Sequence, residues 1–168
     1  MAEEALGKEG HFSCLGAIIH NPQEVRRLSL KGLKIINYIK ELKKGDTLII
    51  RSHGLLPGLI NSAKSCGTNL IDATCPFVKK AQQFCRQLND EGFRIIVIGE
   101  REHPEVKSIV GFADGKATVV EDISDIKKLK LSAGKIGILA QTTQSKEYFH
   151  DLVTALLKRY NGKNSFDQ

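Results

Sequence analysis

Short runs of β-branched and other apolar residues alternate with stretches of helical periodicity along most of the sequence, and this alternation constrains the fold more than any other feature. The predicted strands cover residues 33–36, 47–50, 69–71, 93–98, 117–120 and 135–139. The predicted helices cover residues 22–32, 57–66, 76–89, 104–111 and 145–159. Strands separated by helices of this length indicate crossover connections and a mostly parallel sheet with helices on both faces. The predicted fold class is therefore α/β.

The alternation falls into two consecutive small α/β lobes of similar make-up. We assign residues 1–75 to the first lobe and residues 76–162 to the second, with residues 163–168 as a tail that leads toward a further lobe. Residues 2–7 are typical of the last turn and a half of a helix that ends at a glycine. We therefore expect the first lobe to lack its beginning.

The charge balance favours an anionic ligand. The chain has 25 Lys and Arg against 19 Asp and Glu, a formal charge of +6. The basic residues are spread along the chain in doublets, and aromatic residues make up only 6% of it, whereas a nucleic-acid groove needs clustered cations with aromatic stacking platforms. Nucleic-acid binding is therefore the least favoured of three candidate functions, and a small phosphorylated ligand stays open.

The sequence gives no sign of membrane insertion or export. No uncharged apolar run approaches the roughly 18 residues that a membrane span needs. The first residues are acidic, where a signal peptide is basic. We expect a cytoplasmic protein that does not bind a membrane.

Three histidines follow apolar runs and precede predicted helices. They are His20, His53 and His103, and in a parallel sheet such positions lie at the carboxyl edge, where helix N-termini favour anions. Imidazole donors at this edge suit a phosphate or diphosphate. For each histidine taken alone, the alternative is a loop histidine that caps a helix or is exposed to solvent. A zinc site is disfavoured because no pair of ligands has the usual short spacing, and His11 and His150 do not share the pattern.

Cys75 is the thiol best placed for chemistry. It follows a predicted strand and opens the helix that begins at Pro76, so the helix dipole favours its thiolate as a nucleophile or metal ligand. Alternatively, Cys75 is only a small residue that fills the turn between strand and helix, with Asp72 or Thr74 as the helix cap. Along the same helix, apolar residues at spacings of three and four predict a buried stripe that includes Cys85. Its predicted members are Phe77, Val78, Ala81, Phe84, Cys85 and Leu88.

Polar residues after two other strands complete the predicted edge. Glu105 is either a proton donor or an acid in the first turn of a helix, where the dipole favours it. The hydroxyls of residues 141–145 either contact a ligand or cap the last helix, and capping is the commoner use.

Five segments in this order resemble the LytB, or IspH, family of 4-hydroxy-3-methylbut-2-enyl diphosphate reductases. They are GAIIHNP (residues 16–22), RSHG (51–54), IDATCPFV (71–78), EHPEV (102–106) and AQTTQS (140–145). The resemblance runs from residue 15 to residue 157.

The resemblance implies a three-lobed α/β protein around an oxygen-sensitive 4Fe-4S cluster, with one cysteine ligand from each lobe. The implied reaction is the last step of the methylerythritol phosphate route to isoprenoids. Two electrons from a ferredoxin or flavodoxin, with protons, remove the hydroxyl of the allylic diphosphate as water. The products are isopentenyl and dimethylallyl diphosphate.

The resemblance also implies a role for individual residues. Cys75 matches a cluster ligand, and Glu105 matches the acid that delivers a proton. The residues that match the surroundings of the substrate are His20, His53, His103, Thr142 and Thr143, with His103 and Thr142 also on the catalytic path.

The family's other two cluster cysteines and its last lobe find no match in the chain, and Cys14, Cys66 and Cys85 match no ligand position. We therefore expect a two-lobe fragment without reductase activity of its own. We also expect an exposed apolar lobe interface that favours self-association. The alternative function is a stand-alone diphosphate- or phosphate-binding module without redox chemistry.

Overall fold

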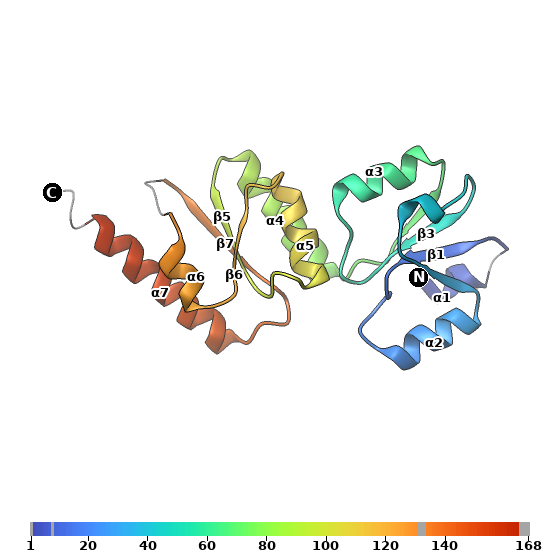
Figure 1. The fold of residues 1–168 in the computed structure, drawn as a ribbon, viewed down its shortest axis with the longest axis horizontal. Coiled ribbons are helices and arrows are strands. Elements are labelled where there is room, and N and C mark those ends of the chain that lie inside the picture. Colours follow the sequence, from blue (N-terminus) through green and yellow to red (C-terminus); the bar gives the residue numbers. More distant parts are fainter. Residues whose placement is uncertain (1, 8, 131–133, 165–168) are drawn as a thin grey trace. The chain divides into compact units, whose positions relative to one another are not determined.

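Each predicted apolar run becomes a β-strand, and the strands form two separate parallel sheets (Figure 1). The structure is a computed structural model that describes residues 2–7, 9–130 and 134–164. The strands are β1 (Phe12–Leu15), β2 (Leu33–Ile36), β3 (Thr47–Ile50), β4 (Asn69–Asp72), β5 (Arg94–Ile98), β6 (Thr118–Val120) and β7 (Ile136–Ala140). The helices are α1 (Ala2–Leu6), α2 (Pro22–Leu30), α3 (Pro57–Ser65), α4 (Pro76–Asp90), α5 (Pro104–Val110), α6 (Ile123–Lys128) and α7 (Lys146–Asn164), with short 3-10 turns η1 (Ile39–Glu41) and η2 (Gly111–Ala113). The predicted α/β class is confirmed.

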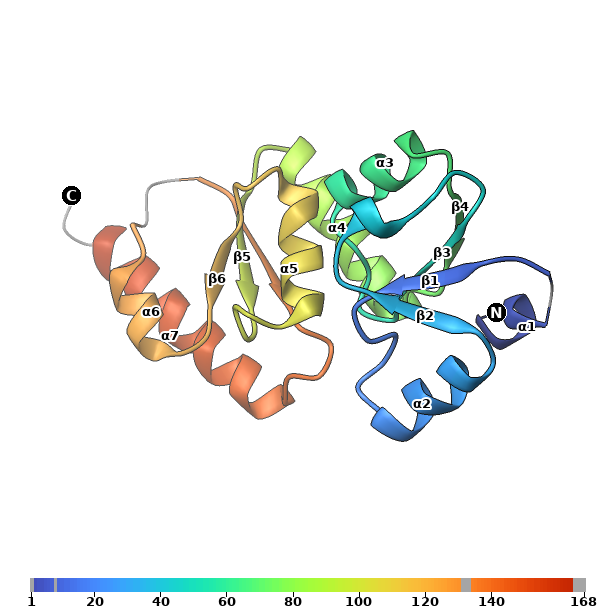
Figure 2. The same cartoon turned by 45° about the vertical axis from the view of Figure 1, so that its right-hand side comes forward.

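The first unit, residues 1–80, contains a four-stranded sheet in the order β2-β1-β3-β4. All pairs are parallel, and β4 lies against β3 with Thr47 opposite Asn69. One face of the sheet packs against α1 and α2, around the fully buried Cys14 and Ile49. The other face packs against α3 and η1 (Figure 2).

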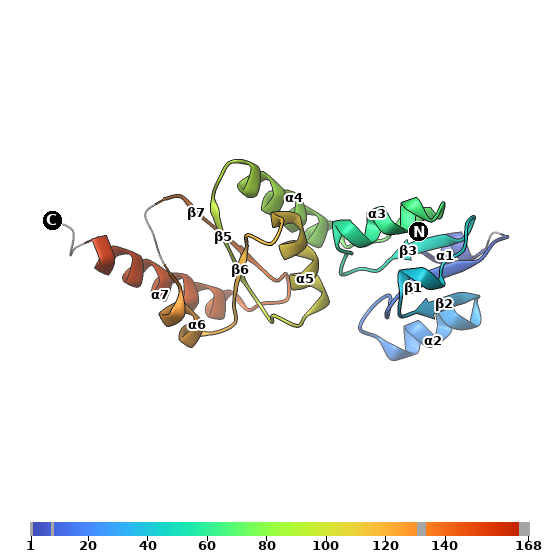
Figure 3. The same ribbon diagram turned by 45° about the horizontal axis from the view of Figure 1, so that its top comes forward.

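The second unit, residues 81–168, contains a three-stranded sheet in the order β6-β5-β7. The central strand β5 pairs with β7 over five residues, and four of its five residues are buried. Helices α4 and α5 cover one face, while α6 and α7 cover the other (Figure 3). The predicted boundary at residues 75 and 76 lies at the start of α4, and the division between the two units falls within that helix.

The two units repeat one arrangement. In each, a helix precedes the central strand, and a glycine, Gly16 or Gly99, follows that strand directly. The N–H of Gly16 donates to the carbonyl oxygen of Ile36 at the end of β2, at 2.9 Å. The N–H of Gly99 donates to the carbonyl oxygen of Val120 at the end of β6, at 3.1 Å. Equivalent strands and the loops that follow them can therefore be compared between the two units.

The buried stripe of α4 differs from its prediction. Phe77 and Phe84 are 73% and 44% exposed, while Gln82 is buried. Phe77 and Phe84 each lie one residue before a buried position, Val78 and Cys85, and one residue turns the helix by about 100°. Gln82 tolerates burial because its amide donates to the hydroxyl of Ser108 at 3.1 Å.

Several element boundaries also differ from the prediction. The apolar residues Ile18 and Ile19, which precede His20, lie in a bend beyond the end of β1 at Leu15. The last helix continues from the predicted end at residue 159 to Asn164, so the predicted tail lies partly in α7 and partly, at residues 165–168, outside the described residues. Helix α6 escaped prediction although Asp122 caps it, accepting from the N–H groups of residues 124 and 125. Over the part of the chain that the structure describes, no helix combines the length and apolarity needed to cross a bilayer.

Candidate functional site

In the first unit, hydrogen bonds join the loops that follow the strands. Both the N–H and the hydroxyl of Ser52, after β3, donate to the carbonyl oxygen of Ile18, after β1, at 3.0 Å. The N–H of Cys75, after β4, donates to the carbonyl oxygen of Ser52 at 2.9 Å. These bonds gather three loops at the carboxyl edge of the sheet, where parallel α/β proteins bind ligands.

The same loops bring two of the predicted histidines together. The rings of His20 and His53 have centroids 4.3 Å apart and are tilted by 53°. His20 is exposed, whereas His53 is only 9% exposed. His20 lies beside Asn21, which caps α2, while His53 lies four residues before α3 begins at Pro57. Neither histidine is therefore the cap of its helix.

Cys75 stands at the N-terminus of α4, as its sequence position predicts. Its carbonyl oxygen accepts the first helical hydrogen bond, from the N–H of Lys79, at 2.9 Å. Asp72 accepts from the N–H of Thr74 at 3.1 Å and pairs with Lys79 at 2.5 Å. Burial acts to raise the pKa of Asp72, but these partners outweigh burial and hold it below its ordinary value. The turn around Cys75 is thus fixed by its neighbours.

Arg51 is a cation at this edge that the sequence analysis did not single out. Its Nε donates to the carbonyl oxygen of Gly54 at 3.4 Å, and its guanidinium also lies beside Gly16. Burial lowers the pKa of Arg51 from its ordinary value. Within the described residues no carboxylate forms an ion pair with it. An arginine directly after a buried strand, in a motif with a histidine, is the signal that could have marked it.

In the second unit, His103 is the N-cap of α5. Its Nδ1 accepts a hydrogen bond from the N–H of Glu105 at 3.2 Å. Because Nδ1 acts as the acceptor, the neutral ring carries its proton on Nε2, which is then the donor for an anion. The alternative of a helix-capping histidine is therefore realised here, and it is compatible with anion binding. The predicted approach of His103 to the other two histidines stays a prediction.

Glu105 is 2% exposed, and its carboxylate accepts two hydrogen bonds from Thr142. One carboxylate oxygen accepts from the N–H of Thr142 at 2.6 Å, and the other accepts from its hydroxyl at 3.0 Å. The two residues are 37 positions apart in the sequence, so the fold alone creates this pair. Residues 141–145 were predicted either to contact a ligand or to cap the last helix. Ser145 has the capping role, because its hydroxyl accepts a hydrogen bond from the N–H of Tyr148.

Gln141 organises the rest of this edge, and sequence reasoning did not single it out. Its side-chain oxygen accepts from the N–H of Glu100 at 3.0 Å, and its amide donates to the hydroxyl of Thr143 at 2.8 Å. It is 3% exposed. A Cβ on Gly99, whose φ is +158°, would lie 2.8 Å from the Cβ of Gln141, so only glycine fits there. A buried polar residue directly after a strand was the available signal.

The four cysteines differ sharply in setting. Burial raises the pKa of Cys14 to about 12 and that of Cys85 to about 11. Cys66 follows α3 and precedes β4, whereas Cys75 follows β4, so these two lie at opposite ends of that strand. Cluster ligation normally takes three or four thiolates at one place. The cysteines of this chain therefore do not form a complete set of cluster ligands.

Comparison with known proteins settles the family. The profile of the LytB protein family matches residues 1–168. The chain belongs to the LytB family. The resemblance carried by the five sequence segments is thereby confirmed.

Relatives and solved structures of this LytB-family chain bear the name of one enzyme. A 4-hydroxy-3-methylbut-2-enyl diphosphate reductase of Geobacter sp. (strain M21) is 45% identical over 159 residues, which cover 95% of this chain and 56% of the relative. The reductase of Aquifex aeolicus is 43% identical, with 91% and 54% covered. The chain spans about half the length of the curated relatives it matches.

The fold comparison agrees. The structure of the E-1-hydroxy-2-methyl-but-2-enyl-4-diphosphate reductase from Plasmodium falciparum superposes with a TM-score of 0.90 at 28% identity, covering 95% of this chain and 51% of that one. A second structure, of (E)-4-hydroxy-3-methyl-but-2-enyl diphosphate reductase, described as the terminal enzyme of the non-mevalonate pathway, gives a TM-score of 0.81 at 42% identity, covering 93% and 56%.

Proposed function

We propose that this chain contributes the diphosphate-binding and proton-delivering residues of a 4-hydroxy-3-methylbut-2-enyl diphosphate reductase. The pairing of buried Glu105 with Thr142 carries this proposal, because an acid held by a hydroxyl at a strand edge is suited to deliver a proton. In this reaction two electrons and two protons convert the substrate into water and isopentenyl or dimethylallyl diphosphate. We propose a ferredoxin or flavodoxin as the electron donor.

In this proposal the imidazoles bind the diphosphate group. His20, His53 and His103 donate hydrogen bonds to its oxygens, and the Thr143 hydroxyl, which Gln141 orients, adds a further donor. The positive guanidinium of Arg51 favours anion binding at the edge of the first unit.

Glu105 and Thr142 deliver a proton to the substrate hydroxyl that leaves. In the structure the Thr142 hydroxyl donates to Glu105; once the carboxylate takes up a proton this bond reverses, so that Glu105 donates to Oγ of Thr142 and the proton of that hydroxyl passes to the departing oxygen. The bond from carbon to oxygen then breaks with water as the leaving group, a far better one than hydroxide.

The family's 4Fe-4S cluster supplies the electrons in the complete reaction, and Cys75 is the residue of this chain that we propose as its ligand. Because the cysteine set is incomplete, no step of the reaction is assigned to a cluster held by this chain alone. The same observation favours the second candidate, a diphosphate-binding module without redox chemistry.

Calorimetric titration of the iron-free chain with the hydroxylated diphosphate tests the binding role. We expect His53→Ala to weaken binding at least about tenfold, as for a lost charge-assisted hydrogen bond, and the matched control His150→Ala, on the exposed face of α7, to leave it unchanged. Absence of binding by the unmodified chain, or equal binding by both variants, contradicts the proposal.

The two candidates separate in their response to the hydroxyl group. If Glu105 and Thr142 serve it, the chain binds the hydroxylated substrate more tightly than isopentenyl diphosphate, and Thr142→Val removes the preference. A simple diphosphate module binds both ligands equally in both forms of the chain.

A further inference from the structure

A hollow opens at the amino edge of the sheet in the first unit. Its volume is about 220 Å³, and it is lined by His11, Gly32 and Asp46, each of which directly precedes a strand. The loops of the candidate site follow the strands and therefore lie at the opposite, carboxyl edge of the same sheet. The hollow is thus separate from the diphosphate site proposed above.

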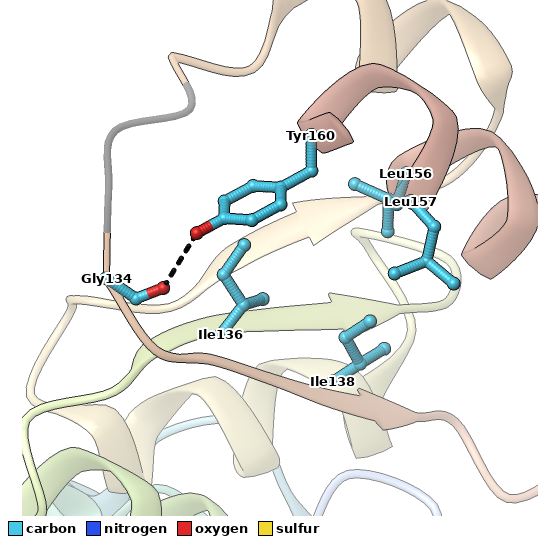
Figure 4. A pocket seen from close by; sticks show the side chains of 6 residues that line it. All are labelled: Gly134, Ile136, Ile138, Leu156, Leu157 and Tyr160. Carbon is cyan, nitrogen blue, oxygen red and sulfur yellow. Dashed lines mark hydrogen bonds between the residues drawn. The ribbon is translucent and has the colours of Figure 1, made fainter. Parts of the chain in front are cut away.

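This hollow is polar, whereas a hollow of comparable size in the second unit is apolar. The apolar hollow measures about 180 Å³ and lies between β7 and the end of α7, where two isoleucines of the strand face Leu156 and Leu157 (Figure 4). None of the described residues that line it is charged. Because an ion loses its hydration in such surroundings without compensation, a charged ligand favours the hollow of the first unit.

Ser13 lines the polar hollow from the interior of the sheet. It lies on β1 between Lys34 of β2 and Leu48 of β3, and it is only 5% exposed. Leu15 and Ile36, on the same face of these strands, belong to the apolar core. Among the residues that the structure describes, none forms a hydrogen bond with the Ser13 hydroxyl. Since buried hydroxyls are normally bonded, the position indicates a partner that enters through the hollow.

Two carboxylates in the wall of the hollow are fixed by main-chain groups. Oε1 of Glu41 accepts from the N–H groups of Asn37 and Tyr38, both at 2.9 Å. These bonds hold the pKa of Glu41 below its ordinary value. Oδ2 of Asp46 accepts from the N–H of Lys43 at 2.8 Å. The second oxygen of each carboxylate receives no hydrogen bond from the described residues, so it is left to a ligand.

Two lysines bring positive charge to the same hollow. Lys34 belongs to β2, in register with Ser13, and Lys43 follows η1. Neither ammonium forms an ion pair with a described carboxylate, although the charge of Lys34 contributes to the low pKa of Glu41. Charges of both signs therefore line one cavity without direct contact, and a ligand that carries both signs complements them.

We propose that this hollow binds a small zwitterion with one ammonium and one carboxylate group, the charge pattern of a free α-amino acid. The carboxylate of the ligand pairs with the two lysines and accepts from the hydroxyl of Ser13, while its ammonium donates to the open oxygens of Glu41 and Asp46. Neither a simple anion nor a simple cation satisfies both sets of groups.

NMR titration of the full, isotope-labelled chain with each of the standard α-amino acids tests this site. We expect at least one of them to shift the amide signals of Ser13, Lys34 and Asp46 in a saturable way. Acetate and methylammonium, the separate halves of glycine, should have no such effect at the same concentration. Absence of saturable shifts with every amino acid, or equal shifts with acetate, methylammonium or inorganic phosphate alone, overturns the proposal.

Charge variants locate the binding of the amino acid that binds best. We expect Lys34→Gln and Asp46→Asn each to weaken it at least about tenfold, because each removes a charge-assisted hydrogen bond. Asp46→Asn keeps an acceptor for the N–H of Lys43 and so preserves the loop. Lys64→Gln, at an exposed residue of α3 that does not line the hollow, is the matched control. Equal binding by all three variants overturns the proposal.

Ser13→Ala separates binding from stability. Because the hydroxyl has no partner among the described residues, we expect an unchanged or higher melting temperature and about three- to tenfold weaker amino-acid binding. The matched control is Thr68→Val, which removes a buried hydroxyl that donates to the carbonyl oxygen of Ala63 at 2.5 Å. It should lower the melting temperature and leave binding unchanged. If Ser13→Ala behaves like Thr68→Val, the hydroxyl is structural and the proposal is overturned.

Discussion

The two units share one topology, but they hold their carboxyl edges together in different ways. In the first unit, main-chain acceptors fix the loops: Ser52 donates to Ile18, and Cys75 donates to Ser52. In the second unit the equivalent loops depend on side chains, since Glu105 holds Thr142 and Gln141 holds Glu100. Main-chain acceptors therefore hold the first edge, whereas side chains hold the second and position a buried acid.

Replacing the glycine that follows the central strand should give the largest difference in stability between the two units. A Cβ on Gly99 meets Gln141 and Val106 at 2.8 Å, whereas one on Gly16 meets only the end of the Arg51 side chain, at 3.1 Å. We expect Gly99→Ala to lower the free energy of unfolding by about 2–4 kcal/mol and Gly16→Ala by about 1 kcal/mol. Urea titration with amide exchange of β5 and β1 measures each unit, and equal losses would show that the glycines are equivalent.

Removal of the buried acid should come next. Glu105→Ala leaves the N–H of Thr142 without its acceptor, at a cost of about 1–3 kcal/mol in the second unit. Ser52→Ala, which removes one of the bonds between the loops at the same edge of the first unit, keeps the main-chain bond from residue 52 to Ile18 and should cost about 0.5 kcal/mol. The comparison breaks if Ser52→Ala proves as costly as Glu105→Ala in the same denaturation experiment.

The two helix caps should differ less. Asn21 accepts from two N–H groups, at 3.1 and 3.2 Å, so Asn21→Ala should destabilise the first unit by about 1 kcal/mol. His103→Asn keeps a capping acceptor on α5 but removes the imidazole donor. We therefore expect His103→Asn to leave stability nearly unchanged and to weaken diphosphate binding, which melting and calorimetry can separate. If His103→Asn binds the diphosphate as well as the unmodified chain does, His103 acts only as a helix cap.

The smallest predicted effect is a loss of stability at low pH. Asp72 has a lowered pKa in the folded chain, so its pair with Lys79 contributes above the ordinary pKa of an aspartate, about 3.9, and the contribution is lost as the pH falls through the folded value. Because both groups are substantially exposed, Asp72→Asn should cost only a few tenths of a kcal/mol at pH 7 and nothing once the pH lies well below the folded-state pKa.

The matched pair in the second unit is Glu102 with Lys107, where the acid is 84% exposed. Glu102→Gln should change stability less than Asp72→Asn does at every pH, because solvent screens the more exposed pair. A larger acid sensitivity in Glu102→Gln would reverse the ranking of the two units. Urea titrations at several pH values measure both variants.

Much of the fold could be read from local pattern, because periodicity reports burial directly. The apolar runs at residues 47–50 and 93–98 became β3 and β5, and prolines marked the starts of α2, α3, α4 and α5. The failures arose where burial depends on neighbouring elements. Phe77 and Phe84 fit the apolar spacing of α4 but are exposed, while Gln82 is buried because Ser108 satisfies it.

The candidate site was predictable to the extent that position along a strand was sufficient. His53, Cys75 and Thr142 could be marked because each follows a strand, where a parallel sheet gathers its ligand-binding loops. Arg51 and Gln141 follow strands as well, but their importance depends on burial and on partners distant in the sequence. Whether a polar residue at a strand end is buried and bonded cannot be read from its neighbours in the chain.

The sequence by itself determined the α/β class, the order of the elements and the family, because alternating periodicity and five local motifs carry that information within short segments. Only the tertiary structure decided that Thr142 holds Glu105 and that Gln141 holds Glu100. Each of these depends on which strand lies beside which, and strand pairing joins residues that are tens of positions apart.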